Sequence, residues 1–469
     1  MSITHLTDNA TICALASGRG GGIALIRVSG SETLRIVSHF FTTKDVEWRP
    51  RHAYYGLWKI HGTIIDEVVV TYYRMPHSYT GEDLVEVSCH ASPYIIRTII
   101  EGLIREGCRP ADPGEYTLRS YLNGKKDLTE AEAVADIIVA ESAVQHRIAL
   151  QQIQGRLRTE LEGLHSALLK FASLMELELD FSEEDVEFAN REQLHTLAVS
   201  IGQRIDQLIA SFNQGKSLHD GIPIAIIGEP NTGKSTLLNA LLQEERAIVS
   251  DIAGTTRDTI EERLIIEGVL FRIIDTAGLR ETSDPIERIG IDRTYQKAEK
   301  ATIILVLLDA VKVLQRGIDS LLAQLEPIKS ESKQQIILIN KMDLIPDSKD
   351  QEQALSLVTS HFPENCIIPL SAKEGLGIKS LQEAMLTTSG ALQIGEEDIF
   401  ITNERHLKAL QEAREYLLRV LDALDTGVSA DLIVHDLRFV LNALGEITGD
   451  TISGEDILHS IFTHFCIGK

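Results

Sequence analysis

The chain has 469 residues, 43% of them hydrophobic, and 69 acidic against 45 basic residues give it a formal net charge of −24. This length predicts about three domains, and this hydrophobic content is enough to bury real cores, so disorder is not the default expectation. A surface this acidic repels phosphate backbones, so a nucleic-acid role would require a local basic patch or a basic partner protein.

The cysteines and the amino-terminal sequence predict a soluble, cytoplasmic protein. The cysteines are odd in number and include no C-x-x-C pair, which fits a reduced compartment and predicts no disulfide framework. Residues 1–8 lack a basic segment ahead of an apolar core, and no run of about eighteen apolar residues occurs, so no membrane association is expected. The cysteines are Cys13, Cys89, Cys108, Cys366 and Cys466.

Residues 1–120 predict an α+β domain of their own. Short strand-like runs occur at Ile23–Ile26, Glu67–Thr71 and Leu84–Val87. Turns that contain Gly and Pro separate these runs, as expected for short strands and helices folded around one core.

The next segment, 121–217, has the pattern of a helical domain. Thr129–Glu132 predicts a capping box at a helix start. Helical periodicity then extends over Ala133–Leu150, Leu157–Leu179 and Leu194–Phe212. We interpret this segment as the first half of a helical domain.

From residue 218 the pattern becomes that of an α/β domain, which we expect to span 218–388. The apolar run Ile222–Ile227 precedes Gly228-Glu-Pro-Asn-Thr-Gly-Lys-Ser235 and a helical run, the strand, loop and helix of a phosphate-binding loop. Loop N–H groups and the helix dipole hold phosphate, Lys234 reaches the β and γ phosphates, and Ser235 ligates magnesium. The loop residues expected to contact nucleotide are Asn231, Thr232, Gly233, Lys234, Ser235 and Thr236.

Two further segments carry the pattern of nucleotide-dependent switches. Thr256 is expected to ligate magnesium only while the γ-phosphate is present, and the adjacent Thr255 is the competing candidate. Asp275-Thr-Ala-Gly278 ends the apolar run that starts at Leu270, which places a carboxylate beside the metal and a glycine N–H beside the γ-phosphate. The expected nucleotide contacts here are Ser250, Asp251, Ile252, Ala253, Gly254, Thr255, Thr256, Asp275, Thr276, Ala277 and Gly278.

A third apolar run ends in Asn340-Lys341-Met-Asp343, which predicts the choice of base. The Asp343 carboxylate can accept hydrogen bonds from both the N1–H and the amine of guanine, a pair that adenine does not offer. Ser371-Ala372-Lys373 resembles the last base-contacting loop, where a backbone N–H meets the guanine oxygen. The segment from 218 to 388 therefore predicts a Ras-like P-loop GTPase domain that binds GTP and GDP.

The catalytic groups are less clear from the sequence. In Ras-like GTPases a glutamine follows D-x-x-G and orients water, whereas this chain has Leu279. Glu287 can take that role, or it can be a solvated carboxylate at a helix start. For the cation that stabilises phosphoryl transfer, Arg257, Arg280 and Arg288 compete with a monovalent ion held by the Asn231 amide and carbonyls of 250–255.

Residues 389–469 return to a helical pattern, with periodic leucines between Leu407 and Leu421, a run over Leu432–Leu444, and Ser453–Asp456 expected to open the last helix. Neither helical stretch looks complete alone. Since the ends of an inserted domain commonly lie close together, we expect one discontinuous helical domain that carries the GTPase domain as an insertion.

The motifs taken together resemble the MnmE family, also called TrmE, GTPases of tRNA wobble-uridine modification. The resemblance covers essentially the whole chain, and the carboxyl-terminal tag discriminates best. It rests on Gly18-Arg-Gly-Gly21, Arg27-Val-Ser-Gly30, Tyr79-Thr-Gly-Glu-Asp83, Pro113-Gly-Glu115, Leu122-Asn-Gly-Lys-Lys-Asp127, Ile252-Ala-Gly-Thr-Thr-Arg-Asp258, Asp275-Thr-Ala-Gly-Leu-Arg280 and Cys466-Ile-Gly-Lys469.

This resemblance implies an enzyme that works with a flavoprotein partner, MnmG, in a hetero-oligomer. Such proteins add an aminomethyl or carboxymethylaminomethyl group at carbon 5 of the wobble uridine, using a carbon carried by tetrahydrofolate. FAD would enter only through the partner, and tRNA mainly through the complex. The amino-terminal domain, 1–120, would be a folate-binding-like and homodimerisation domain.

The resemblance also implies site residues. Potassium would replace an arginine finger, held by Asn231, Ser250, Ile252 and Thr255, and Glu287 would orient water while the GTPase domains pair. A tetrahydrofolate derivative, in the 5-formyl or methylene form, would contact Arg27, Glu86, Lys125 and Lys469. Cys466 would lie near the folate carbon, either as a reactive thiol or as pocket lining.

Two other classes of function are compatible with the residues. One is a GTP-regulated RNA- or ribosome-associated binding module without modification chemistry, although such proteins usually add a basic domain that this chain lacks. The other is a scaffold whose folate-like domain has lost its ligand.

Overall fold

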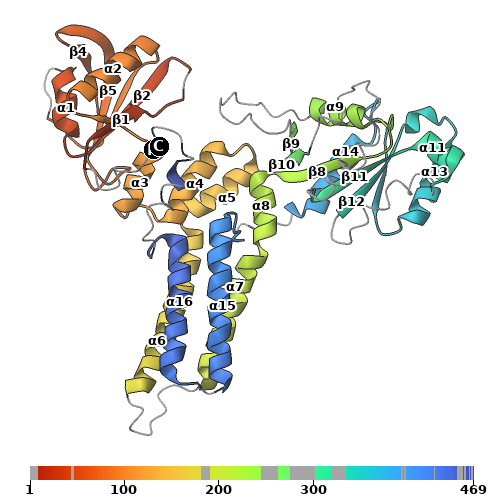
Figure 1. Cartoon of the computed structure of the whole chain (residues 1–469). Coiled ribbons are helices and arrows are strands. Elements are labelled where there is room, and N and C mark those ends of the chain that lie inside the picture. The colour runs from red at the N-terminus through yellow and green to blue at the C-terminus, as the bar shows by residue number, and fades with distance from the viewer. Residues whose placement is uncertain are drawn as a thin grey trace. The chain divides into compact units, whose positions relative to one another are not determined.

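The computed structural model describes residues 9–18, 20–43, 47–180, 191–244, 262–274, 301–318, 334–391, 395, 398–426, 428–451, 458, 461–463, 465 and 468. The chain forms two compact units (Figure 1). The first combines Met1–Val139, Ala149–Ile209 and Glu404–Lys469, and the second combines Ala140–Ile148 with Ala210–Asn403.

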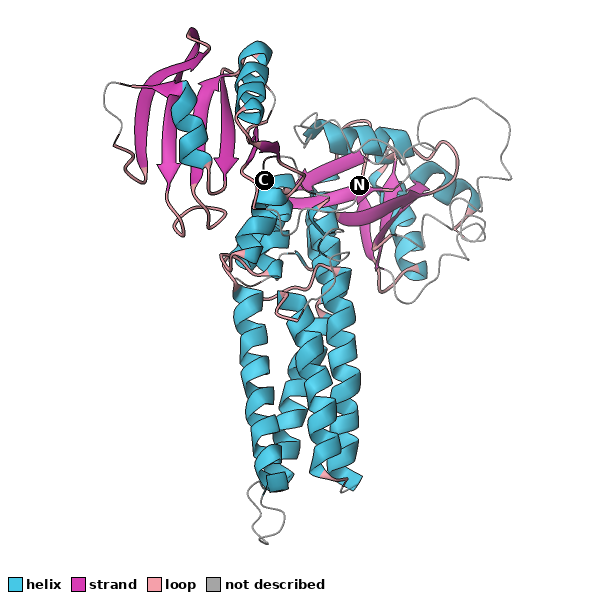
Figure 2. Ribbon diagram, turned by 60° about the vertical axis from the view of Figure 1, so that its left-hand side comes forward, coloured by secondary structure: helices cyan, strands magenta, loops and turns pink. Residues whose placement is uncertain are grey.

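The first unit begins with a seven-stranded sheet in the order β3-β4-β5-β6-β2-β1-β7. Neighbouring strands are antiparallel except for the parallel pair β1 and β7. Trp58 is fully buried in its core, which α1 and α2 complete (Figure 2). The elements are β1 Ile12–Leu15, β2 Ile23–Ser29, α1 Thr33–Phe40, β3 Phe41–Thr42, β4 His52–Ile60, β5 Thr63–Tyr73, β6 Leu84–His90, α2 Pro93–Arg105 and β7 Arg109–Pro110.

The rest of the first unit is helical and draws on both helical stretches of the sequence. Four long helices, α6, α7, α15 and α16, run side by side (Figure 1). Ion pairs join helices from opposite stretches: Arg414 Nε lies 2.7 Å from Asp206 Oδ1, and Arg438 Nη2 lies 3.2 Å from Glu176 Oε1. The helices are α3 Glu115–Leu122, α4 Leu128–Val139, α6 Arg156–Asp180, α7 Arg191–Ala210, α15 Glu404–Thr426 and α16 Ala430–Thr448.

The predicted capping box at Thr129–Glu132 is wrong, because α4 starts earlier. Asp127 Oδ1 accepts hydrogen bonds from Glu130 N (2.7 Å) and from the Thr129 hydroxyl (2.8 Å), while Glu130 Oε2 accepts one from Asp127 N (3.0 Å). Asp127 and Glu130 therefore form the reciprocal pair. Glu132 is engaged elsewhere, with Arg405 and His406.

The predicted helical run Ala133–Leu150 is two helices, α4 and α5 (Ala143–Ile153). The second begins with its own capping box: Ser142 Oγ accepts from Gln145 N at 3.2 Å, and Gln145 Oε1 accepts from Ser142 N at 3.0 Å. The S-x-x-Q pattern was present in the sequence, but the apolar residues on either side of it suggest an unbroken helix.

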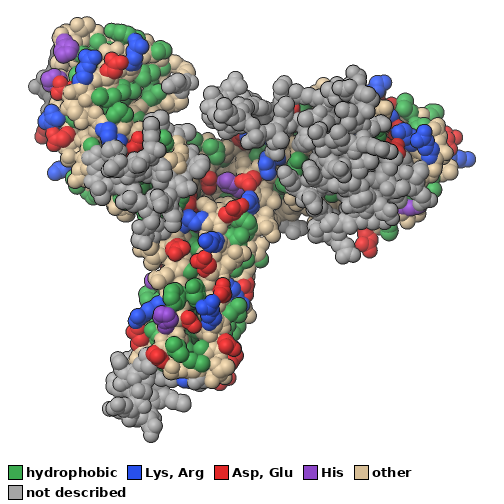
Figure 3. Space-filling model, viewed as in Figure 1, with side chains coloured by type: hydrophobic (Ala, Val, Ile, Leu, Met, Phe, Trp, Pro, Cys, Tyr) green, Lys and Arg blue, Asp and Glu red, His purple; other side chains and the backbone are tan. Residues whose placement is uncertain are grey.

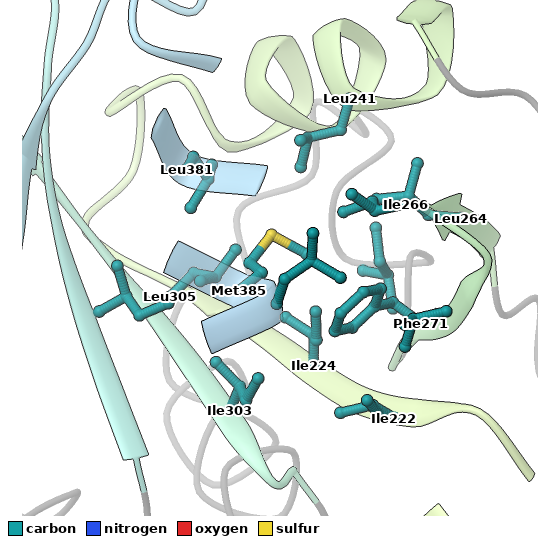
Figure 4. Packing of buried hydrophobic residues seen from close by; sticks show 14 of the residues in the cluster. Ile222, Ile224, Leu241, Leu264, Ile266, Phe271, Ile303, Leu305, Leu381 and Met385 are labelled. Carbon is teal, nitrogen blue, oxygen red and sulfur yellow. The ribbon is translucent and has the colours of Figure 1, made fainter. Parts of the chain in front are cut away.

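The second unit contains a six-stranded sheet in the order β13-β12-β11-β8-β10-β9, parallel except for β9. Ile224, Phe271 and Leu305 of the sheet pack against Leu241 of α9 and Met385 of α14 (Figure 4). The elements are α8 Phe212–Asp220, β8 Ile222–Ile227, α9 Lys234–Glu244, β9 Glu262–Ile266, β10 Val269–Ile273, β11 Ile303–Asp309, α11 Ala310–Arg316, β12 Gln334–Asn340, η3 Met342–Leu344, α13 Ser348–His361, β13 Cys366–Pro369 and α14 Ile378–Ser389.

The first half of α5 packs into this α/β unit. Val144 and Ile148 belong to its hydrophobic core, and Val144 N donates to the carbonyl oxygen of Gly268 at 3.1 Å, in the turn between β9 and β10. Gln145 Nε2 also donates to His219 O at 2.6 Å. A piece of the first helical stretch thus completes the core of the inserted unit.

The two ends of the inserted unit lie together. Ile401 N donates to the Ser211 hydroxyl at 3.1 Å, just before α8. A Cβ atom on Gly215 in α8 would lie 2.5 Å from Ile401 O and 3.0 Å from Phe400 Cβ. The absent side chain of Gly215 therefore lets the returning chain pass against α8.

A buried charged group lies where the chain re-enters the first unit. Glu132 of α4 pairs with Arg405 (3.1 Å) and His406 (2.8 Å), and Arg405 donates to the carbonyl oxygens of Glu446 and Ile447 at the end of α16. Burial alone raises the pKa of Glu132, but His406 and Arg405 outweigh burial and lower it. The cluster thereby joins three helices from both helical stretches.

The fold class predicted from the sequence is confirmed: an α+β part, a discontinuous helical part and an inserted α/β part. In the described part of the chain, no helix combines the length and apolarity needed to cross a membrane. The four cysteines described there, Cys13, Cys89, Cys108 and Cys366, are free. On the bundle face of Figure 3, acidic and basic side chains are interspersed.

We expect Gly215→Ala to destabilise the second unit by about 1–3 kcal/mol, because the new methyl group overlaps the returning backbone. The matched control is Gly163→Ala in α6, where a Cβ meets nothing within 4 Å. That change should stabilise by about 0.5–1 kcal/mol, as Ala does in a helix. Thermal unfolding followed by calorimetry measures both variants, and equal melting temperatures would contradict the close passage at Gly215.

We expect Glu132→Gln to lower the free energy of unfolding by about 3 kcal/mol near neutral pH, because the half-buried Arg405 and the buried His406 lose their anion. The pKa of Glu132 is lower in the folded protein than in the unfolded chain, where a glutamate has a pKa of about 4.3. The ionised carboxylate therefore stabilises the fold fully above about pH 4.3, and this stabilisation is lost as the pH falls through the lower folded-state pKa. The gap between wild type and variant should therefore shrink below about pH 4. Urea titrations from pH 3 to 7 measure it, with Glu162→Gln, in the exposed pair with Arg158, as the control.

Candidate functional site

The parallel strands β8, β11, β12 and β13 all end at the same edge of the second sheet. Asp309 and Asn340 are the last residues of β11 and β12, Gly228 follows β8, and Leu370 and Ser371 follow β13. From β8 the chain proceeds to β9 and β10 on one side and to β11, β12 and β13 on the other. Ligands bind at such a switch point, beyond the carboxyl ends of the strands.

The phosphate loop curls between β8 and α9. Lys234 Nζ donates to the carbonyl oxygens of Gly228 (2.9 Å) and Glu229 (2.8 Å), which places the ammonium inside the curve. Gly233 has φ +99° and lies against the Asn340 side chain, so no larger residue fits there. The helix begins at Lys234, so its N–H groups and dipole face the loop.

Asn340 joins the phosphate loop to the last loop of the site. Its Nδ2 donates to Thr232 O at 2.7 Å, and its Oδ1 accepts from Ala372 N at 3.0 Å. Asn340, Thr232 and Ala372 are all buried. This side chain therefore fixes the two loops relative to each other.

Asp343 lies exposed at the rim, where a base can reach it. The buried Ser371 hydroxyl donates to Asp343 Oδ1 at 2.6 Å and also accepts from Glu374 N at 3.3 Å. This bond orients the carboxylate, which matches the paired donors of guanine. Ser235 is half-buried, and Thr236, Lys373 and Asn231 are exposed.

The roles of Glu229 within this loop and of Asp309 and Lys312 beside it were not predicted from the sequence. Lys341 Nζ lies 2.7 Å from Asp309 Oδ2 and also donates to Asn231 O at 2.7 Å. Lys312 Nζ lies 2.8 Å from Glu229 Oε2. Asp309 gave a usable signal, since in the sequence it ends an apolar run as Asp275 does, whereas Glu229 and Lys312 gave none.

The remaining predicted residues of the nucleotide site lie outside the residues that the structure describes. They include both candidate switch threonines and the candidate catalytic residue. The set is Ser250, Asp251, Ile252, Ala253, Gly254, Thr255, Thr256, Asp275, Thr276, Ala277, Gly278, Leu279 and Glu287.

The amino-terminal domain holds a second cluster around Arg27. Arg27 is paired in register with Glu86 across β2 and β6, and its Nη2 lies 2.7 Å from Glu86 Oε1. The rings of Tyr79 and Tyr116 lie 5.2 and 5.6 Å from the guanidinium carbon. Arg27 Nη1 also donates to Gly468 O at 3.3 Å, so the carboxyl-terminal segment reaches this cluster.

The two tyrosines were not predicted as part of this cluster. Burial raises the pKa of Tyr79 and of Tyr116, so both hydroxyls stay protonated at neutral pH. The Tyr116 hydroxyl donates to Arg27 O at 2.7 Å. Lys125 is exposed, and its side chain lies near Gly81 of the Tyr79–Asp83 motif. Cys466 and Lys469 lie outside the described residues.

The arrangement at the second sheet defines a P-loop GTPase. Comparison with known families then gives two matches, the MnmE helical domain over residues 128–466 and the GTP-binding protein TrmE N-terminus over residues 11–125. The chain belongs to the MnmE family of tRNA modification GTPases.

Full-length relatives support this assignment. The chain is 46% identical to the tRNA modification GTPase MnmE of Bacteroides thetaiotaomicron, over 98% of this chain and 99% of that protein. It is 47% identical to the protein of the same name from Porphyromonas gingivalis, over 100% of both chains.

Solved structures match part of the chain. The FeoB G-domain from Methanococcus jannaschii is 30% identical over 36% of this chain and 97% of that chain, with a TM-score of 0.24. A variant of Aquifex aeolicus Era bound to GDP.AlF4- is 28% identical over 42% of this chain and 66% of that chain, with a TM-score of 0.28.

We expect Ser371→Ala to weaken GDP binding about fivefold, because the Asp343 carboxylate loses the hydroxyl that orients it. The change should not improve the binding of ADP, since the guanine-specific carboxylate remains. Titration with fluorescent GDP and ADP measures both, and Ser380→Ala on the exposed face of α14 is the control. Unchanged GDP affinity would show that Asp343 needs no orienting partner.

Proposed function

We propose that this GTPase depends on potassium and serves modification at carbon 5 of the tRNA wobble uridine. In this proposal it acts as a homodimer with the flavoprotein MnmG, takes a carbon from a tetrahydrofolate derivative, and works in the cytoplasm. FAD enters only with the partner, and tRNA is bound mainly by the complex. The family assignment supports the proposal, and the geometry of Asn231 carries its potassium part.

Asn231 offers what a potassium ion needs, a neutral oxygen next to the phosphates. Its backbone is left-handed, with φ +63°, a conformation that Asn tolerates better than most residues. Among the described residues, its side-chain amide has no hydrogen-bond partner, while its carbonyl oxygen accepts from Lys341. The amide oxygen is thus available for a cation, and in this proposal Ser250, Ile252 and Thr255 supply the further potassium contacts.

The remaining roles follow from the same proposal. Ser235 and Thr256 ligate magnesium, with Thr255 as the alternative to Thr256. Glu287 orients the attacking water, since Leu279 has no polar atom in its side chain. Bound potassium supplies positive charge where phosphoryl transfer develops negative charge.

The Arg27 cluster is our candidate folate site. Arg27 and Glu86 combine a cation with a carboxylate, which suits the acidic tail and the paired N–H groups of a pterin. The half-buried Tyr79 ring adds flat apolar surface for such a ring, while the fully buried Tyr116 holds the Arg27 backbone through its hydroxyl. In this proposal Lys125 and Lys469 complete the contacts, and Cys466 serves either as a reactive thiol or as pocket lining.

We further propose four segments for these roles. Residues 1–120 bind folate and dimerise, and 218–388 form the GTPase domain. Residues 121–217 and 389–469 are the two halves of the helical domain.

Potassium dependence is tested by GTP hydrolysis in potassium and in sodium at matched ionic strength. We expect wild type to turn over at least about tenfold faster in potassium, as an added cation at the transition state predicts. Asn231→Ala should lose most of that preference, whereas Asn239→Ala on the exposed face of α9 should keep it. Glu287→Ala should bind GDP normally but lose turnover in both salts.

Size-exclusion chromatography with GDP and aluminium fluoride adds a second measurement. Pairing of GTPase domains in potassium but not in sodium is expected. Equal, slow rates in both salts would refute the potassium proposal and leave the catalytic cation to an arginine or a partner.

A further inference from the structure

The start of α11 is linked to the phosphate loop in two ways. Its N-cap residue Asp309 pairs with Lys341, which in turn donates to the carbonyl oxygen of Asn231. Three residues later, Lys312 pairs directly with Glu229 of the loop. The two loop residues held in this way lie on either side of Pro230.

Asp309 is fixed on both of its oxygens. Oδ1 accepts from Val311 N at 3.1 Å and so caps α11, while Oδ2 lies 2.7 Å from Lys341 Nζ. The residue is only 5% exposed, so the pair with Lys341 is weakly screened. A carboxylate held by a helix cap gives the lysine ammonium one defined position.

Lys341 transmits this position to Asn231. The residue beside the phosphates has a strained left-handed backbone, and the hydrogen bond from Lys341 Nζ to its carbonyl oxygen favours that conformation over others. The carbonyl carbon and the side chain of Asn231 are bonded to the same Cα atom. Fixing the carbonyl group therefore also limits the directions in which the side-chain amide can point. Asp309 therefore acts on Asn231 through Lys341.

Lys312 holds the start of the loop. Its partner Glu229 also presents its carbonyl oxygen to three donors: Lys234 Nζ at 2.8 Å, the Thr232 hydroxyl at 2.9 Å and Thr232 N at 3.4 Å. The ion pair between Lys312 and Glu229 thus anchors the residue around which the loop closes.

We propose that Asp309 and Lys312 are positioning residues that hold the phosphate loop in the shape in which Asn231 can bind potassium. The proposal rests on the potassium dependence proposed above. Neither residue touches nucleotide or cation; Asp309 acts through Lys341, and Lys312 acts through Glu229. The consequence is that potassium affinity depends on charges in a helix outside the sequence motifs.

Asp309→Asn separates this role from helix capping. Asn caps a helix about as well as Asp does, but it removes the charge that holds Lys341. Asp347→Asn is the matched control, since Asp347 caps α13 through Lys349 N at 3.0 Å in the same unit. For Lys312→Gln the control is Arg316→Gln, which removes a positive charge from the exposed end of the same helix.

The experiment measures the potassium concentration at half-maximal effect in two ways. One is GTP hydrolysis, and the other is the fluorescence of labelled GDP bound with aluminium fluoride, which needs no turnover. We expect Asp309→Asn to raise this concentration about tenfold in both, the effect of losing one charge-assisted contact, with kcat at saturating potassium nearly unchanged. Lys312→Gln should raise it about threefold, and both controls should leave it unchanged.

Three outcomes separate the possibilities. In the first outcome, wild type responds to potassium, but Asp309→Asn and Lys312→Gln have the same half-maximal potassium concentration as wild type. This result overturns the positioning role and leaves the proposed potassium dependence intact. A lower melting temperature without a shift in potassium concentration assigns both residues to stability only and also overturns it. Wild type without any potassium response overturns the proposed function and this inference with it. If Asp309→Asn does not fold, the Lys312→Gln shift decides.

Discussion

The architecture depends on the closure of the inserted unit beside α8. A domain can interrupt a helical bundle only if its two ends lie close together, since otherwise the helices before and after it cannot pair. Here the hydrogen bond between Ser211 and Ile401 and the bare Cα of Gly215 bring the ends together. With the ends joined, α15 and α16 can pack against α6 and α7, and the cluster of Glu132, Arg405 and His406 can bind both stretches into one unit.

The boundary of the α/β unit does not follow the sequence segments. The first half of α5 lies far from the P-loop in the sequence. Val144 and Ile148 of this helix nevertheless belong to the hydrophobic core of the α/β unit, beside β9 and β10. This placement has a physical reason: an edge hairpin leaves apolar residues uncovered, and an amphipathic helix that covers them contributes about 25 cal/mol for each Å² of apolar surface removed from water. Periodicity identifies the helix but not the surface that it covers.

What could be predicted from the sequence was the part encoded by local patterns. Apolar runs that end in Gly228 and Asn340 identified strands and loops, because a parallel strand and its loop lie next to each other in the chain. The start of α4 was missed since two overlapping patterns, at Asp127 and Thr129, each satisfy a capping box, and only the fold decides between them. The pairs of Asp309 with Lys341 and of Glu229 with Lys312 join residues 32 and 83 positions apart, and no local pattern encodes them.

Those distant pairs also answer how a chain of charge −24 can hold a triphosphate. Carboxylates near the phosphates would repel them, and a buried charge is tolerated only with a partner. Asp309 and Glu229 each carry a lysine at 2.7–2.8 Å, so neither adds a net negative charge to the site. The loop amides, the α9 dipole and Lys234 are then left to attract phosphate. The charge of the surface and that around the phosphate loop are therefore set independently, because Asp309 and Glu229 each carry their own cation.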